Sequence, residues 1–227
     1  MKKINGVIIL VFVALVATAQ ENVPTKLRIG LYANGGISSL VQGMGMNMNM
    51  YGSGYSSMYG TNMTMYNYTS SFGAGVSLTV PFHPRWSFVG NIGYMNRGAN
   101  YGTMNSSSYD SRYRLNYLDV WALAQYNNVP KGPVKFIASI GLTESTLLSA
   151  RNETSMGNQN MMSNMNRVDI GMVLGPGLEF ALKKKGAIQT RLLYTYGFTN
   201  VFTGSYYDSG MHSNNASFIL QVGYLFN

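Results

Sequence analysis

Apolar and polar residues alternate along most of this chain. The clearest case is residues 215–226, where every second side chain is large and apolar: Phe218, Leu220, Val222, Tyr224 and Phe226. Because successive side chains of a β-strand point to opposite faces, a period of two predicts a strand with one apolar and one mixed face. We expect eight such strands and no helix, over approximately residues 26–39, 69–80, 86–97, 114–126, 134–148, 168–180, 188–199 and 215–226.

The connections between these segments alternate in length. Short turns are expected at Pro81–Arg85, Asn127–Pro133 and Lys183–Gly186, and long polar connections at about residues 40–68, 99–113, 150–166 and 202–214. Short periplasmic turns and longer extracellular loops are typical of bacterial outer-membrane barrels. The pattern therefore predicts an all-β fold: an eight-stranded antiparallel transmembrane β-barrel.

A soluble barrel of the lipocalin kind is the alternative, with an apolar lumen and a charged exterior. Here the mixed face carries small residues, which belong on the inside of a narrow barrel: Gly30, Gly73, Gly75, Gly93, Gly171, Gly175, Gly177, Gly197 and Gly223. The apolar face carries aromatic residues near strand ends: Trp86, Tyr126, Phe136, Tyr194 and Tyr224. Charged residues make up only 11% of the chain, against about 25% in soluble domains. We therefore expect the outer membrane of a Gram-negative bacterium.

The first residues have the features of an export signal. Lys2 and Lys3 precede the apolar run Ile8–Val16, and the small-residue pattern Ala17-Thr18-Ala19 follows. This order predicts a secretory signal peptide at residues 1–19 and a barrel domain at residues 20–227. The sequence has no cysteine, which excludes disulfides and thiol chemistry.

The net charge of +8 would by itself suggest a nucleic-acid partner. An exported barrel does not meet nucleic acid, so none is expected. Lysines assigned to the short turns suit anionic phospholipid head groups: Lys131, Lys135, Lys183, Lys184 and Lys185. The expected partners are outer-membrane lipids and lipopolysaccharide, and a protein bound through the extracellular loops.

Charged residues on the mixed face are predicted to form a polar network inside the barrel. They are Arg28, Arg97, Asp119, Asp169, Glu179 and Arg191. Buried charge without a partner is very costly, so these groups should pair and hydrogen-bond. One interpretation is a proton or ion path. The other, which we favour, is a polar core that fills and rigidifies the lumen, as in other small barrels.

No catalytic site is expected. A hydrolase needs a nucleophile, a base and an orienting group, and the only histidines are His83, in a short turn, and His212, beside Ser213 and near Asp208. Lipid-A deacylases use a His–Ser pair, but on the outer wall at membrane depth and not in a polar loop. We predict neither an enzyme nor a bound cofactor.

Methionine is concentrated in the expected loops, which hold thirteen of the sixteen. The M-x-M spacing of Met44, Met46, Met48 and Met50 makes these thioethers candidate Cu(I) ligands. A flexible adhesive surface is the alternative. Alternate side chains of an extended strand lie about 6.6 Å apart, too far to share one ion. We therefore predict no metal site.

Several segments resemble the PorT-like outer-membrane β-barrel family. Tyr117–Tyr126 (YLDVWALAQY) is similar to that family's YLEIPLLLKY strand, with Asp for Glu and Trp for Pro at positions 119 and 121. Four further segments carry the likeness: Asn91–Gly98, Arg167–Glu179, Arg191–Asn200 and Val222–Phe226. Further departures are Asn91, which stands for Glu, and Gln125, which stands for Lys. The resemblance implies an eight-stranded barrel and little about activity, although the family's namesake is linked to type IX protein secretion.

The function predicted from the sequence is a non-enzymatic outer-membrane barrel with a side-chain-filled lumen. Its loops, rich in Met, Tyr and Asn, would serve structural or interaction roles. The alternatives are an accessory component of protein secretion and a lipid-A-modifying hydrolase.

Overall fold

The computed structural model describes residues 26–42, 64–103, 111–128, 133–182, 186–203 and 213–226. Eight long strands dominate: β1 (Arg28–Gln42), β3 (Thr69–His83), β4 (Trp86–Thr103), β5 (Ser111–Asn127), β6 (Val134–Thr154), β8 (Val168–Ala181), β9 (Ala187–Gly197) and β10 (Ser213–Leu225). Two four-residue strands, β2 (Thr64–Asn67) and β7 (Gly157–Asn160), and one 3₁₀ turn, η1 (Met162–Asn164), complete the described elements. Within this part of the chain, no helix is long and apolar enough to cross a membrane.

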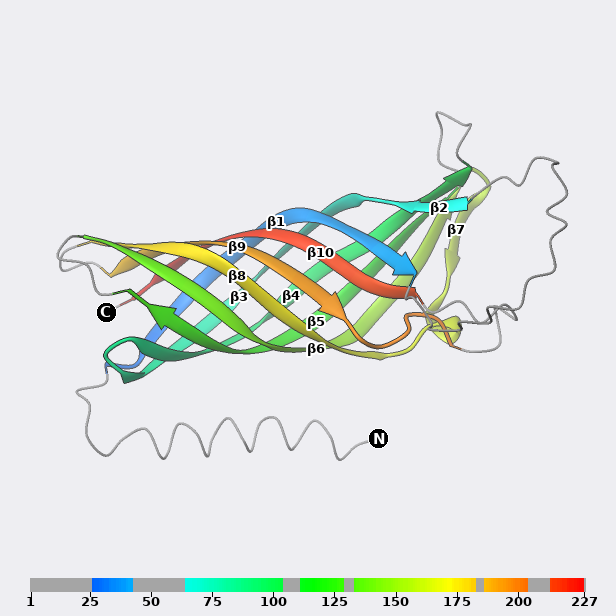
Figure 1. Cartoon of the computed structure of the whole chain (residues 1–227). Helices are drawn as coiled ribbons and strands as arrows, with labels where there is room; N and C mark the ends of the chain where they lie inside the picture. The colour runs from blue at the N-terminus through cyan, green and yellow to red at the C-terminus, as the bar shows by residue number, and fades with distance from the viewer. Residues whose placement is uncertain are drawn as a thin grey trace, which may run out of the picture.

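The eight long strands close into a barrel. Each pairs antiparallel with its neighbours along the chain. The ring is completed by β1 and β10, which pair from Gly30↔Leu225 to Gln42↔Ser213. Figure 1 shows the resulting tube of steeply tilted strands. The predicted eight-stranded antiparallel barrel is confirmed, and the short β2 and β7 pair with β4 and β6 outside the ring.

The two ends of the barrel differ. At one end β3 and β4 are joined by a tight turn at Pro84 and Arg85, and β1 begins and β10 ends there (Figure 1). We call this the turn end and the opposite end the loop end. At the loop end the chain forms the longer connections, including the segment after Thr154 that contains β7 and η1.

Several strands extend further at the loop end than the alternation predicted, and the three neighbours β4, β5 and β6 are the longest. β4 runs to Thr103, β5 starts at Ser111 and β6 runs to Thr154, so much of the expected loops 99–113 and 150–166 is strand. The outward side chains there are polar or charged, which removes the hydrophobic alternation, while backbone pairing continues. With 18, 17 and 21 residues, these strands exceed the roughly 9–11 that cross a bilayer. They therefore rise above the membrane.

The outer face of the barrel is apolar and partly exposed. Leu31, Ile140 and Leu192 expose more than half of their surface. Aromatic pairs mark both edges of this apolar band: Trp86 with Tyr126 towards the turn end, and Phe72 with Tyr94 towards the loop end. Such an apolar band with aromatic borders is the lipid-facing surface of a membrane barrel.

Two glycines allow the barrel wall to lie close to the side chain of Tyr32 in the interior. Gly75 and Gly93 lie directly opposite each other on β3 and β4, and the hydroxyl of Tyr32 lies over both. The Tyr32 ring stacks on Trp121 with centroids 6.4 Å apart. A side chain at either glycine would occupy the space of the Tyr32 hydroxyl.

Candidate functional site: the barrel interior and wall

The first polar group of the interior surrounds Glu179 of β8, near the turn end. This carboxylate is 1% exposed and forms an ion pair with Arg28, whose Nη1 donates to Oε1 at 2.9 Å and whose Nη2 donates to Oε2 at 3.2 Å. Lys135 Nζ donates to Oε1 at 3.2 Å and Gln189 Nε2 to Oε2 at 2.7 Å. Charge-assisted hydrogen bonds of this kind compensate the desolvation of a buried carboxylate.

Arg191 lies beside this group and is held by amides. Its guanidinium donates to the side-chain oxygens of three glutamines: Gln221 at 2.9 Å, Gln125 at 2.7 Å and Gln189 at 2.6 Å. No carboxylate of the described residues lies within 4.0 Å of it. Gln189 bonds both Arg191 and Glu179, so it joins the arginine to the first group.

The second polar group is centred on Arg97 and Asp119, from the adjacent strands β4 and β5. They form an ion pair, and their side chains are each 3% exposed. Arg97 Nη1 also donates to Ser145 Oγ at 3.2 Å, and its guanidinium lies 5.5 Å from the centre of the Tyr117 ring. Trp121 Nε1 donates to Asp119 at 3.3 Å.

Asp169 belongs to the same level of the barrel. Its Oδ2 accepts a hydrogen bond from Asn215 Nδ2 at 2.8 Å, while its Oδ1 has no partner among the described residues. The same Asn215 nitrogen donates to the Tyr117 hydroxyl at 3.1 Å.

The structure thus places all six predicted network residues in the interior, but in two groups. Arg28 pairs with Glu179 and Arg97 with Asp119, whereas Arg191 and Asp169 have no opposite charge within 4.0 Å among the described residues. The sequence reasoning did not single out several neutral partners: Gln125, Ser145, Gln189, Asn215 and Gln221. Their only signal was a polar side chain on the mixed face.

Apolar layers separate and cover these polar groups. The inward side chains of β5 show the order of the layers. From the turn end they are Gln125, beside the first polar group, then the apolar Leu123 and Trp121, and then Asp119 of the second polar group. The apolar layer between them contains Val89, Met95, Trp121, Leu123, Val173, Leu193 and Ile219. A larger apolar cluster lies towards the loop end and consists of Leu40, Ala99, Tyr113, Leu115, Tyr117, Leu147, Ala150, Met161, Met165, Val201 and Phe202.

The remaining sequence candidates do not join these groups. His83 is exposed at the end of β3, where its Nδ1 accepts a hydrogen bond from the backbone N–H of Arg85 in the turn at 3.3 Å. Lys135 lies on β6 and reaches Glu179, so its assignment to a turn was wrong. Other candidates lie outside the described residues: Met44, Met46, Met48, Met50, Lys131, Lys183–Lys185, Asp208, His212 and residues 1–19. Within the described residues, no three Asp, Glu or His side chains gather as a metal site would require.

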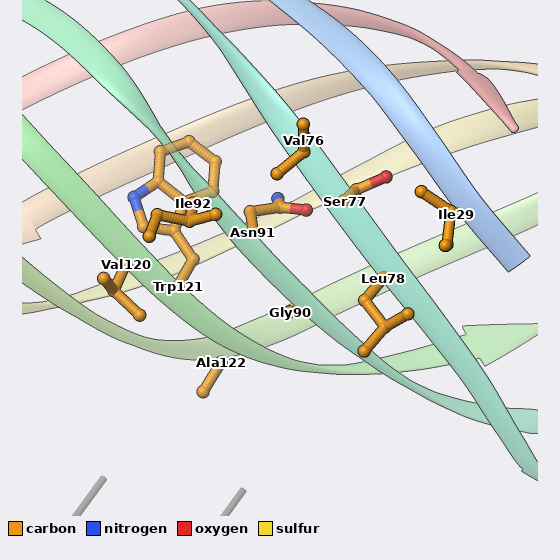
Figure 2. Close-up of a pocket in the computed structure, with 10 residues that line it drawn as sticks. All are labelled: Ile29, Val76, Ser77, Leu78, Gly90, Asn91, Ile92, Val120, Trp121 and Ala122. Atoms are coloured by element: carbon orange, nitrogen blue, oxygen red, sulfur yellow. The ribbon is translucent and has the colours of Figure 1, made fainter. Parts of the chain in front are cut away.

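The outer wall has a recess of about 380 Å³ across β1, β3, β4 and β5. The recess forms around Gly90, whose cross-strand partners are Leu78 and Ala122. Because glycine has no side chain, it leaves a gap in the apolar surface between them. Figure 2 shows Leu78, Ile92 and Val120 around this position. The recess opens on the lipid-facing surface, where acyl chains are the surrounding medium.

A closed barrel with an apolar outer band and a packed polar interior defines an integral protein of the bacterial outer membrane. The chain belongs to the family described as "Outer membrane protein beta-barrel domain", which matches residues 18–203. No relative with a curated description matches the sequence.

Solved structures with a similar fold include three outer-membrane proteins. OprG from Pseudomonas aeruginosa has 12% identity and a TM-score of 0.48, over 87% of this chain and 96% of that chain. Neisserial surface protein A has 12% identity and a TM-score of 0.45, over 86% and 96%. Ail of Yersinia pestis has 14% identity and a TM-score of 0.43, over 88% and 98%.

Proposed function

We propose that this protein is a non-conducting, non-enzymatic outer-membrane barrel whose lumen is a structural plug. The loop end faces the outside of the cell, as the lengths of the connections favour. In this arrangement the barrel anchors its loops, and the protein acts through its outer surfaces: the wall towards lipid and the Met-, Tyr- and Asn-rich loops towards a partner.

The observation that carries this proposal is the stacking of layers across the lumen. A path for water or ions would have to pass the Glu179 group, the apolar layer around Trp121, the Arg97–Asp119 pair and the loop-end cluster around Tyr117. Eight-stranded barrels have an interior just wide enough for side chains to fill. The charged side chains form ion pairs with one another and hydrogen bonds with neighbouring amide side chains. These fixed contacts favour a rigid core over a proton path.

The placement of Ser213 and His83 supports a non-enzymatic role. Ser213 is buried at the first position of β10, at the loop end, and its backbone N–H donates to Asn200 at 3.1 Å. It therefore lies away from the lipid-facing wall, where a lipid-A hydrolase would need its nucleophile. His83 is at the opposite end of the barrel.

Membership of the PorT-like branch, and with it an accessory role in protein secretion, is a narrower proposal. It is supported by where the similar segments lie. The likeness covers Arg97, Asp119, Asp169, Glu179 and Arg191, all of which contribute to the interior polar groups. A deletion strain with normal export of secreted proteins would contradict this branch of the proposal and leave the structural role intact.

We expect the purified barrel to give no stable conductance in a planar lipid bilayer. The layers described above leave no continuous polar route, so current should remain at the level of the bare membrane. Folding of the same preparation is checked by heat-modifiable gel mobility, so that absence of current is not due to unfolded chain. Stable, ion-selective steps from folded protein would contradict the proposed plug.

A further inference from the structure

The outer face of β5 and β6 changes from apolar to basic at the loop end. On β5 the outward side chains run from Val120 and Leu118 through Asn116 to Arg114 and Arg112. Asn116 marks the border, because its Oδ1 accepts a hydrogen bond from the hydroxyl of Tyr94, part of the aromatic edge, at 2.6 Å. The arginines therefore begin directly above the lipid-facing band.

Their height matches the head groups of the outer leaflet. Arg114 is four residues beyond Leu118, about 13 Å along the strand and roughly 10 Å in height at a tilt of ~40°. The polar head-group region adds roughly 5–8 Å on each side of the hydrocarbon core. Long arginine side chains at this height reach lipid phosphates.

The protein neutralises only part of this cluster: among the described residues, Glu153 is the one carboxylate within 4.0 Å of these three arginines. Arg114 and Arg151 are direct cross-strand partners on β5 and β6, and like charges in such positions destabilise a sheet. Glu153 pairs with Arg114, with Nε and Oε1 2.9 Å apart. Arg112 contacts the neutral hydroxyl of Ser70 at 3.2 Å. Arg151 has no ion pair within 4.0 Å among the described residues.

We propose that Arg112, Arg114 and Arg151 form a site for a phosphate group of lipid A in the outer leaflet. The planar guanidinium binds phosphate oxygens in a bidentate manner, and an anion between Arg114 and Arg151 removes their mutual repulsion. The site rests on the proposed orientation with the loop end outside, where lipid A lies. It does not depend on whether the lumen conducts.

The test measures lipid binding to the folded full chain in nanodiscs by native mass spectrometry. The probes are diphosphoryl lipid A and the same lipid after removal of both phosphates. We expect clear preference for the phosphorylated form. The triple substitution Arg112→Gln, Arg114→Gln, Arg151→Gln should weaken its binding on the order of a hundredfold, from about a fivefold loss for each of the three arginines.

Two matched variants separate a lipid site from a structural role. Glu153→Gln removes the ion pair of Arg114 and should tighten lipid A binding severalfold. If the arginines have only a structural role, the same substitution should give no gain in binding. Arg85→Gln, at the turn end, should leave binding unchanged. If the triple variant does not fold, Arg151→Gln alone should still weaken binding measurably.

Equal binding of the two lipids, or unchanged binding by the folded arginine variants, would overturn the site. Equally tight binding of phosphatidylglycerol would do so as well, because it would show a general preference for anions. A conducting barrel that still prefers phosphorylated lipid A would overturn the plug and leave this site standing.

Discussion

Asp119→Asn is expected to lower the free energy of unfolding by about 3–5 kcal/mol, the usual penalty for removing one partner of a buried ion pair. Asp119 is 2% exposed and Arg97 3%, so the substitution leaves the arginine buried without its counter-charge. The contacts that remain to Arg97, the Ser145 hydroxyl and the Tyr117 ring, carry no negative charge. Urea unfolding in detergent, followed by the fluorescence of the two tryptophans, measures the change.

The control is a carboxylate with the same chemistry in a different environment. Glu153→Gln breaks a pair whose side chains are 46% and 30% exposed, and surface pairs contribute about 0–1 kcal/mol. Replacing both members of the buried pair, Arg97→Met with Asp119→Leu, should cost less than Asp119→Asn because no charge is left unpaired. Equal losses for Asp119→Asn and Glu153→Gln would contradict the interior assignment.

Gly93→Ala is expected to destabilise the barrel by about 1–3 kcal/mol, the range for an extra methyl group in a packed core. The new Cβ would lie 2.5 Å from the Tyr32 hydroxyl, 2.5 Å from the Ala74 carbonyl oxygen and 2.8 Å from Gly75 Cα. Two of these are backbone atoms of the neighbouring strand, so the wall itself has to move. The denaturation midpoint and the fraction folded by gel mobility report the effect.

Gly35→Ala is the matched control, because a Cβ there has no heavy atom within 4 Å. It should change stability by less than about 0.5 kcal/mol. Tyr32→Phe removes one of the three close atoms at Gly93, so Gly93→Ala should cost less in that background. A Gly93→Ala protein as stable as Gly35→Ala would show that the lumen is wider than the packing indicates.

The alternation of side chains was sufficient to predict the strands and which residues face inward. Every second side chain of a strand lies on the same face, so this prediction needs no knowledge of how the strands pack. It failed where the environment on the outer face changes from lipid to water. Above the hydrocarbon core, Arg112, Arg114 and Arg151 replace apolar residues on the outer face, so the segment has the polar composition of a loop although β5 and β6 remain paired.

The pairing of interior charges was not predictable in the same way. The alternation predicts that Arg28 and Glu179 both face inward. It does not predict that these residues, 151 positions apart, lie at the same height along the barrel axis. That height depends on the stagger between strands and on irregularities such as the register shift at Asn116/Tyr117. For the same reason no pattern showed that Arg191 would be held by three glutamines.

The seam between β1 and β10 has a consequence for how the molecule is made. It joins residues almost 200 positions apart, such as Gly30 and Leu225, so its loop-closure entropy must be overcome before its hydrogen bonds contribute. Until β10 arrives, β1 has one unpaired edge, which is a template for pairing with other chains. The exported chain therefore needs protection from aggregation during its passage to the membrane. Insertion is complete only when β10 has paired with β1.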